Sequence, residues 1–219
     1  MDQDSCEYYL NSSMAYNLFY ELMKMGLDNR PHFLYIEPMA NRFITSDIHF
    51  GHKNILKFCP KTRPYSSIDE MDEAIITEWN KIVSPNDLAY ILGDISYREP
   101  SHTAKIFARL NGDKILIAGN HDEKALKHQV FRDCFKEIHN YLEISVNKHK
   151  VVLFHYPIAE WNGMHRGSVH LYGHLHGGLS GLEEFRARDA GIDATGKIVV
   201  PIETLVNDAL TGKVKSHHA

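Results

Sequence analysis

Cysteine is scarce in this sequence of 219 residues, and Cys6, Cys59 and Cys134 are widely separated and odd in number. They form no CxxC pair, so the sequence supports neither a zinc knuckle nor a disulfide framework. Such usage fits a reducing compartment, and we expect a cytoplasmic location. The start of the chain, MDQD at residues 1–4, lacks the basic residues that open a signal peptide, which agrees with this expectation.

Long apolar runs and an excess of basic residues are also missing. No apolar stretch reaches the roughly 20 residues needed to cross a bilayer, so no membrane partner is expected. The formal net charge is −4, which does not indicate a dedicated nucleic-acid-binding surface, although local basic patches near a phosphate site remain compatible with it. Hydrophobic residues make up 43% and charged residues 24%, which is ordinary for a globular domain with a sizeable core.

Histidine, by contrast, is abundant, with 15 residues in the chain. Many of these histidines stand in short motifs with aspartate, asparagine and glycine, and most of the motifs come where an apolar run ends. In chain order the motifs are Asp47-Ile48-His49, Gly93-Asp94, Gly119-Asn120-His121-Asp122, the lone His155 and Gly173-His174-Leu175-His176. Each motif alone is weak evidence, but the ordered set supplies carboxylate, amide and imidazole ligands for two metal ions.

In their order and residue types these motifs resemble those of the calcineurin-like metallophosphoesterases, whose pattern is D-x-H, G-D, G-N-H-D or G-N-H-E, a lone His and G-H-x-H. The resemblance covers about residues 41–205, and further strings are similar to small, compact members of the family. These are HFGHKNI at residues 49–55, the pair Arg63-Pro64, EMDEAIITEWNKIV at residues 70–83, and Tyr156-Pro157 with Trp161. We therefore expect a phosphoesterase domain at 41–219, preceded by an N-terminal helical extension at 1–40 in which residues 7–25 form a helix.

The pattern of apolar residues predicts an α/β fold. Helices alternate with strands early in the chain, and strands dominate later. Strands are expected at 42–45, 88–92, 114–118, 138–146, 150–154, 169–172 and 197–200, and helices at 67–83, 101–110, 123–128 and 202–210. The strands at 138–146 and 150–154 are expected to form a hairpin that turns near Asn147 and Lys148. This order suggests a four-layer α/β/β/α sandwich, two mixed β-sheets flanked by helices, and the resemblance implies the same architecture.

The resemblance also implies a role for each motif residue. Asp47, His49 and His176 would hold a first metal ion, Asn120, His155 and His174 would hold a second, and Asp94 would bridge the two. His121 would not be a ligand but would lie beside the substrate, where it would protonate the leaving group or stabilise charge on the phosphate. Asp94 and His121 are thus the expected catalytic residues.

The mixed oxygen and nitrogen ligands suit two divalent transition metal ions rather than calcium. We expect manganese first, with iron, zinc or nickel as alternatives. In an extended stretch, side chains repeat every two residues, so His174 and His176 would point the same way, as would Asp47 and His49. Gly93, Gly119 and Gly173 would let the backbone turn sharply beside the metals.

Several other residues remain open between two interpretations. His52 and Asn54 line the cleft or begin the following helix, and Arg63 contacts a phosphate or forms a surface salt bridge. Asp122 orients His121 or caps a helix, with the second interpretation favoured. Three further residues lie in a loop between two ligand motifs: Trp161, Asn162 and His165. The sequence leaves open whether they face the substrate.

The function that follows is a metal-dependent phosphoesterase in which the metal ions neutralise the charge of the phosphate and make hydroxide available as the nucleophile. Its substrate would be a small phosphate ester, in first place a phosphodiester of a nucleotide-like molecule, with phosphomonoesters as a variant. The alternative is an interaction module that keeps the fold and has lost catalysis; intact ligands and His121 disfavour it. The sequence leaves the natural substrate, the native metals and the oligomeric state open.

Overall fold

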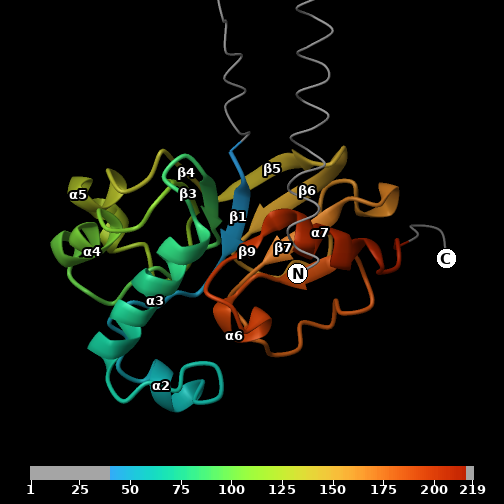
Figure 1. Cartoon of the computed structure of the whole chain (residues 1–219). Helices are drawn as coiled ribbons and strands as arrows, with labels where there is room; N and C mark the ends of the chain where they lie inside the picture. The colour runs from blue at the N-terminus through green and yellow to red at the C-terminus, as the bar shows by residue number, and fades with distance from the viewer. Residues whose placement is uncertain (1–39, 216–219) are drawn as a thin grey trace, which may run out of the picture. The chain divides into compact units, whose positions relative to one another are not determined.

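The computed structural model describes residues 40–215, so the helix expected at 7–25 lies outside the described part of the chain (Figure 1). Two β-sheets with helices beside them make up this part. Within it, no helix combines the length and the apolar character needed to cross a membrane.

The first sheet has five strands in the order β4-β3-β2-β1-β9. Strands β1 to β4 run parallel to one another, and β9 pairs with β1 in the antiparallel direction, so the sheet is mixed. Their bounds are Arg42–Thr45 for β1, Leu88–Ile91 for β2, Asp113–Ile117 for β3, Glu137–His139 for β4 and Val200–Pro201 for β9.

The second sheet has four strands in the order β5-β6-β7-β8. Their bounds are Tyr141–Val146 for β5, His149–Phe154 for β6, Val169–Tyr172 for β7 and Ala187–Asp189 for β8. β5 and β6 form an antiparallel hairpin, whereas β6, β7 and β8 are parallel. The predicted hairpin turn is confirmed, because Asn147 and Lys148 both have positive φ, 48° and 68°. A two-residue turn needs positive φ at both positions to match the twist of the two strands.

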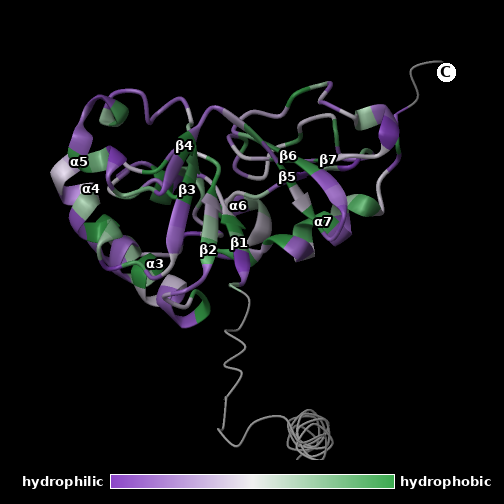
Figure 2. Ribbon diagram, turned by 90° about the horizontal axis from the view of Figure 1, so that it is seen from above, coloured by the Kyte–Doolittle hydropathy of each residue, from purple (hydrophilic) through white to green (hydrophobic). Residues whose placement is uncertain are grey.

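Helices α3, α4 and α5 gather on one side of strands β1 to β4 (Figure 2). The helices are α2 (Ile55–Phe58), α3 (Ile68–Ile82), α4 (Pro100–Phe107), α5 (Gln129–Arg132), α6 (Ile192–Thr195) and α7 (Ile202–Leu210), with 3₁₀ turns η1 (Ala125–Lys127) and η2 (Met164–Arg166). The predicted start of α3 is confirmed, because the Glu70 backbone N–H donates to Ser67 Oγ at 3.1 Å. Met71, Ile75 and Trp79 then recur every four residues and are buried, so this face covers the sheet.

Alternation along the strands divides the hydrophobic core into layers. On β1, Phe43 faces the cluster under α3, whereas its neighbour Ile44 faces the cluster shared by both sheets. On β6, Val151 and Leu153 join that shared cluster, and Val152 points outward to a third cluster. The predicted α/β architecture of two mixed sheets flanked by helices is therefore confirmed.

Some element boundaries were wrong. The strand expected at 138–146 is two strands, because the chain leaves the first sheet after His139 and enters the second at Tyr141. An apolar pattern shows that a segment is extended but not which sheet it joins. The strand expected at 197–200 reduces to the short β9, and the helix expected at 123–128 becomes η1 followed by α5. Helix α4 ends at Phe107 rather than at residue 110.

Candidate metal centre

The motif residues all follow the carboxyl ends of strands, where sites form in α/β sheets. Asp47 and His49 follow β1, Asp94 follows β2, Asn120 and His121 follow β3, His155 follows β6, and His174 and His176 follow β7. Backbone hydrogen bonds join the loops: the Asp47 N–H donates to Gly93 O at 3.1 Å, and the His49 N–H donates to Asp94 O at 3.0 Å. Residues from distant parts of the sequence are thereby brought together.

The backbone of these loops differs from the extended form that we expected. Asp47, His49, Asp94, His174 and His176 all have positive φ, between 49° and 74°. This left-handed conformation is uncommon outside glycine and costs free energy, and it clusters at functional sites. The spacing argument was therefore wrong about the backbone, although the paired side chains do converge on one place. The strain is held by the surrounding hydrogen bonds.

Two of the motif glycines are needed for close approach rather than for an unusual turn. A Cβ on Gly119 would lie 2.4 Å from Asp94 Oδ1, and a Cβ on Gly173 would lie 1.9 Å from Ser46 Oγ. Of the three motif glycines only Gly93 has positive φ, at 89°. The glycines thus let neighbouring loops pack closely enough for their side chains to meet.

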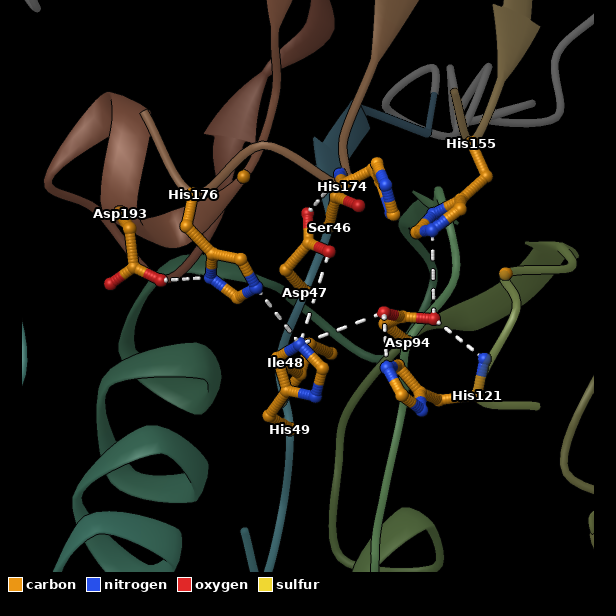
Figure 3. A network of polar contacts seen from close by, with 12 residues as sticks. Ser46, Asp47, Ile48, His49, Asp94, His121, His155, His174, His176 and Asp193 are labelled. Atoms are coloured by element: carbon orange, nitrogen blue, oxygen red, sulfur yellow. Dashed lines mark hydrogen bonds and ion pairs between the residues drawn. The ribbon is translucent and has the colours of Figure 1, made fainter. Parts of the chain in front are cut away.

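Figure 3 shows how the side chains converge. Three groups of side chains place their ligand atoms within 4.8 Å of one another, and two of them consist of predicted ligands: Asp47, His49 and His176 form the first, and Asp94, His155 and His174 form the second. The third group, Cys59, His176 and Asp193, shares His176 with the first. Asn120 belongs with the second group, because its Oδ1 lies 2.9 Å from His155 Nε2. All seven residues predicted as ligands are therefore side by side.

Asp94 lies between the two groups. Its Oδ1 is 3.6 Å from His155 Nε2, and its Oδ2 is 3.7 Å from His49 Nε2. One carboxylate oxygen thus faces each group, which is the arrangement that a bridging ligand requires. The His121 backbone N–H donates to Asp94 Oδ1 at 3.0 Å and helps to hold the carboxylate in place.

The donors in the first group fit a cation. Asp47 is fully buried, its Oδ1 has no hydrogen-bond partner, and burial raises its pKa to about 6. Burial, with a smaller contribution from His176, lowers the pKa of His49 to about 2, so its imidazole is neutral and can offer a lone pair. A buried carboxylate oxygen without a partner is costly, and a positive ion would satisfy it.

Hydrogen bonds select the ring nitrogen that each of two histidines presents. Nδ1 of His155 lies 2.6 Å from Leu92 O, and Nδ1 of His176 lies 2.7 Å from Asp193 Oδ2. Both partners only accept, so each Nδ1 carries a proton and each Nε2 is the nitrogen turned toward the centre. This is the second layer of support that metal-binding histidines usually have.

Asp193, on α6, was missed by the sequence analysis because it stands in no recognisable motif. It accepts hydrogen bonds from Arg63 Nε and Nη2, both at 3.0 Å, and from Thr62 Oγ1 at 2.5 Å. Burial acts to raise the pKa of Asp193, but the bonds from His176 and Arg63 outweigh it and hold the pKa well below its usual range. Asp193 is therefore ionised.

The structure corrects both of our interpretations of Arg63. Its side chain is buried, so it neither reaches a phosphate nor forms a surface salt bridge. Besides Asp193, it donates through Nη1 to Ile48 O at 2.8 Å and through Nη2 to Asp47 O at 2.6 Å. The guanidinium thus stabilises the strained backbone of the Asp47-Ile48-His49 motif.

His121 faces the solvent at the edge of the centre, with 44% of its side chain exposed. Its Nε2 lies 3.8 Å from Asp94 Oδ2, so it is near the ligands without belonging to either group. The hydroxyl of Tyr97 lies 2.8 Å from Nδ1 and 3.1 Å from Nε2 of His121. Tyr97 follows Asp94 by three residues, but we assigned it no role from the sequence.

A cavity of about 440 Å³ opens beside the centre. It is lined by His49, His52, Ile55, Phe58, Cys59, Tyr97, His121 and His176, and we call it the aromatic cavity. His52 therefore lines the cleft, whereas Asn54 precedes the first residue of α2 and begins that helix. The interpretation as a cleft-lining residue is therefore correct for His52, and the interpretation as the start of the helix is correct for Asn54.

Other interpretations need correction. The Asp122 side chain neither orients His121 nor caps a helix, because it accepts from the backbone N–H groups of Asp94, Ile95 and Gly119 and so ties two ligand loops together.

The three loop residues Trp161, Asn162 and His165 differ in their surroundings. Trp161 is buried in the outer cluster, where its Nε1 donates to Ser168 O. Asn162 is exposed and donates to Glu143. Neither lines the aromatic cavity, and neither does the exposed His165.

Comparison with known proteins gives the class. The family model of the calcineurin-like phosphoesterases (Metallophos) matches residues 42–208. The chain is 32% identical to "Uncharacterized protein MJ1445" of Methanocaldococcus jannaschii over 140 residues, 63% of this chain and 70% of that protein. It is 26% identical to "Gene 66 protein" of Mycobacterium phage L5 over 193 residues, 74% of this chain and 90% of the phage protein.

A solved structure is similar as well. The crystal structure of the protein of unknown function AQ665 from Aquifex aeolicus superimposes with a TM-score of 0.59 at 25% identity, covering 77% of this chain and 98% of that one. The chain therefore belongs to the calcineurin-like phosphoesterase family, whose members use divalent metal ions to hydrolyse phosphate esters. The motif residues described above form its candidate site.

Proposed function

We propose that this protein is a metal-dependent phosphodiesterase that acts on small, nucleotide-like phosphate esters and also accepts phosphomonoesters. The observation that carries the proposal is the position of Asp94, with one carboxylate oxygen facing each of two ligand groups. Asp47, His49 and His176 would hold one divalent ion, and Asn120, His155 and His174 the other, with Asp94 shared. Manganese is the first metal to test, because the ligands mix oxygen and nitrogen without cysteine.

When bound, two such ions would neutralise the charge of the phosphate and lower the pKa of a water molecule. The residues of the chain then have separate tasks. The backbone held by Arg63 keeps Asp47 and His49 in position, and the hydrogen bonds of His155 and His176 turn each Nε2 toward the centre. His121, exposed beside Asp94, is placed to donate a proton to the departing oxygen.

The aromatic cavity beside the metal centre is the basis for proposing a small ester as the substrate. His121 and Tyr97 line the aromatic cavity together with His49 and His176, so a phosphate placed at the centre would leave one ester arm room to extend along it. A phosphodiester carries two such arms, and a monoester carries one. The same centre serves both reactions, with diesters expected first.

The test is hydrolysis of bis(p-nitrophenyl) phosphate by protein stripped with a chelator and then reconstituted with manganese, iron, zinc or nickel. We expect two ions per chain, no activity after stripping and recovery on addition of metal. Full activity in a sample shown to be free of metal would refute the proposal. Two bound ions without turnover of any phosphate ester would favour the non-catalytic interaction module instead.

A further inference from the structure

The aromatic cavity shares Tyr97 and His121 with a second cavity, but the two differ in charge. The second cavity includes Arg98, Glu99, Glu123 and Lys124 among its lining residues. The aromatic cavity has no aspartate, glutamate, lysine or arginine in its lining, and its volume of about 440 Å³ is in the range of small-molecule sites. The lining therefore offers no carboxylate, ammonium or guanidinium group to pair with a charged arm, so this cavity suits an uncharged arm of a phosphate ester.

Phe58 gives the aromatic cavity an exposed apolar surface. Phe58 is the last residue of α2, and 69% of it is exposed, whereas Ile55 at the start of the helix is only 2% exposed. The buried Ile55 anchors α2, and one turn later Phe58 points to the cavity. Because His49 and His176 line the same cavity, a group resting on Phe58 would be continuous with a phosphate at the metal centre.

The neighbouring rings are held in place. His52 stacks on Tyr97 with ring centroids 4.1 Å apart and an angle of 17° between the planes. The Phe58 centroid lies 6.2 Å from that of His52 at an angle of 57°, which leaves the face of Phe58 open rather than covered by His52. Aromatic faces of this kind bind other flat rings, and stacking of a base on an aromatic side chain tolerates any base.

We propose that the aromatic cavity binds the planar, uncharged ring of a nucleotide substrate, with the nucleobase stacked on Phe58. The inference rests on the proposed function, because it places the phosphate at the centre and asks where the rest of the substrate lies. Phe58 then sets specificity: it favours esters whose arm ends in a flat ring over esters with an aliphatic arm of the same charge.

The experiment compares adenosine 5′-monophosphate with ribose 5-phosphate, which has the same phosphate and sugar but no base. Both are tested as competitors in initial rates of bis(p-nitrophenyl) phosphate hydrolysis by the manganese-loaded protein, where the inhibition constant reports a competing substrate as well as an inhibitor. Calorimetry gives the dissociation constants if no ester is turned over. We expect the nucleotide to bind about 5- to 150-fold more tightly than the sugar phosphate, the range that corresponds to one stacked base.

Three variants make the comparison specific. Phe58→Ala should remove the advantage of the nucleotide and leave ribose 5-phosphate binding within about twofold of the original, and Phe58→Trp should keep the advantage. Leu179→Ala is the matched control, because Leu179 is an apolar residue that is 88% exposed and does not line the aromatic cavity. It should change neither ligand. Unchanged circular dichroism and thermal midpoints show that the variants are folded.

The outcomes separate this inference from the proposed function. If the protein hydrolyses the aryl diester but binds both ligands equally, or if Phe58→Ala weakens both equally, the base does not stack on Phe58 and the inference is overturned. If the nucleotide is preferred through Phe58 and no ester is turned over, the binding site stands and the phosphodiesterase proposal fails.

Discussion

Nδ1 of His176 lies 2.7 Å from Oδ2 of Asp193, and the same carboxylate binds the buried guanidinium of Arg63. Arg63 in turn donates to Asp47 O. One aspartate on α6 thus connects both ends of the first ligand group, His176 directly and Asp47 through Arg63. The geometry of the first ligand group therefore depends on a residue outside the two predicted ligand groups.

Replacement of this aspartate tests that dependence. Asp193→Ala should lower metal affinity at the first ligand group by about 10- to 100-fold, because His176 loses the acceptor that fixes its ring. It should also destabilise the fold by about 3–5 kcal/mol, since Arg63 is left as a buried charge without its partner. Metal competition with a chelator and urea denaturation measure the two effects.

The control for this variant is Asp208→Ala, which removes a mostly exposed partner of Arg188. We expect it to leave metal affinity unchanged and to alter stability by less than about 1 kcal/mol. Asp193→Ala with wild-type metal affinity would contradict a role in holding His176.

Asp94 and His121 should give different kinds of inactive protein. Asp94→Ala should lose metal and activity together, because both ligand groups lose their shared carboxylate. His121→Ala should keep both ions and slow turnover by about 10²–10⁴-fold, the usual range for general acid catalysis. Metal analysis and steady-state kinetics on the same preparations distinguish the two.

The leaving group sharpens the assignment of His121. A nitrophenolate departs without a proton, so the defect of His121→Ala should be larger on a nucleotide ester than on a nitrophenyl ester. Equal defects on both esters would mean that His121 stabilises charge rather than donating a proton. Loss of metal from this variant would show that the role is wrong.

Tyr97→Phe tests whether the tyrosine hydroxyl positions His121. The variant keeps the ring that stacks on His52 and removes only the hydrogen bond, 2.8 Å long, to His121. A hydrogen bond of this kind contributes about 0.5–1.5 kcal/mol, so kcat should fall by roughly 2- to 12-fold with KM and metal content unchanged. The dependence of kcat on pH should shift as well. An unaltered pH profile together with unaltered kcat would exclude the positioning role.

Glu143 on β5 should make stability depend on pH at a place outside the metal centre. Bonds from Lys150, then Asn162 and Tyr141, lower the pKa of Glu143 to about 2 from its ordinary 4.5. A lowered folded-state pKa stabilises the fold above about pH 4.5, and this stabilisation is lost as the pH falls from 4.5 toward 2. Because Glu143 lies near the surface, the contribution should be at most about 1 kcal/mol.

Urea midpoints of Glu143→Gln and the original protein, measured at pH 7, 5, 4 and 3, test this prediction. The difference should be largest at pH 7 and shrink through the lower values. Lys150→Ala, alone and combined with Glu143→Gln, supplies the double-mutant cycle, whose coupling should shrink over the same window. A difference that grows on acidification would contradict the sign.

Much of the fold followed from local pattern. The four-residue spacing of Met71, Ile75 and Trp79 defines the buried face of α3, and Asn147 marks the hairpin turn because asparagine adopts a left-handed backbone more readily than most residues. The motif order also named the seven side chains that the structure brings together. These features depend on neighbours in sequence, so a single chain is enough to recognise them.

The sequence by itself determined the class of the protein and the set of chemical groups at its centre, because both are expressed in short motifs at strand ends. Tertiary structure alone decided which groups support them. Arg63 and Asp193 are 130 residues apart and meet only because α6 packs beside the first motif, and the break between β4 and β5 depends on which sheet each strand joins. The burial of a charge and the strain of a left-handed backbone are settled by partners distant in sequence, which no local pattern records.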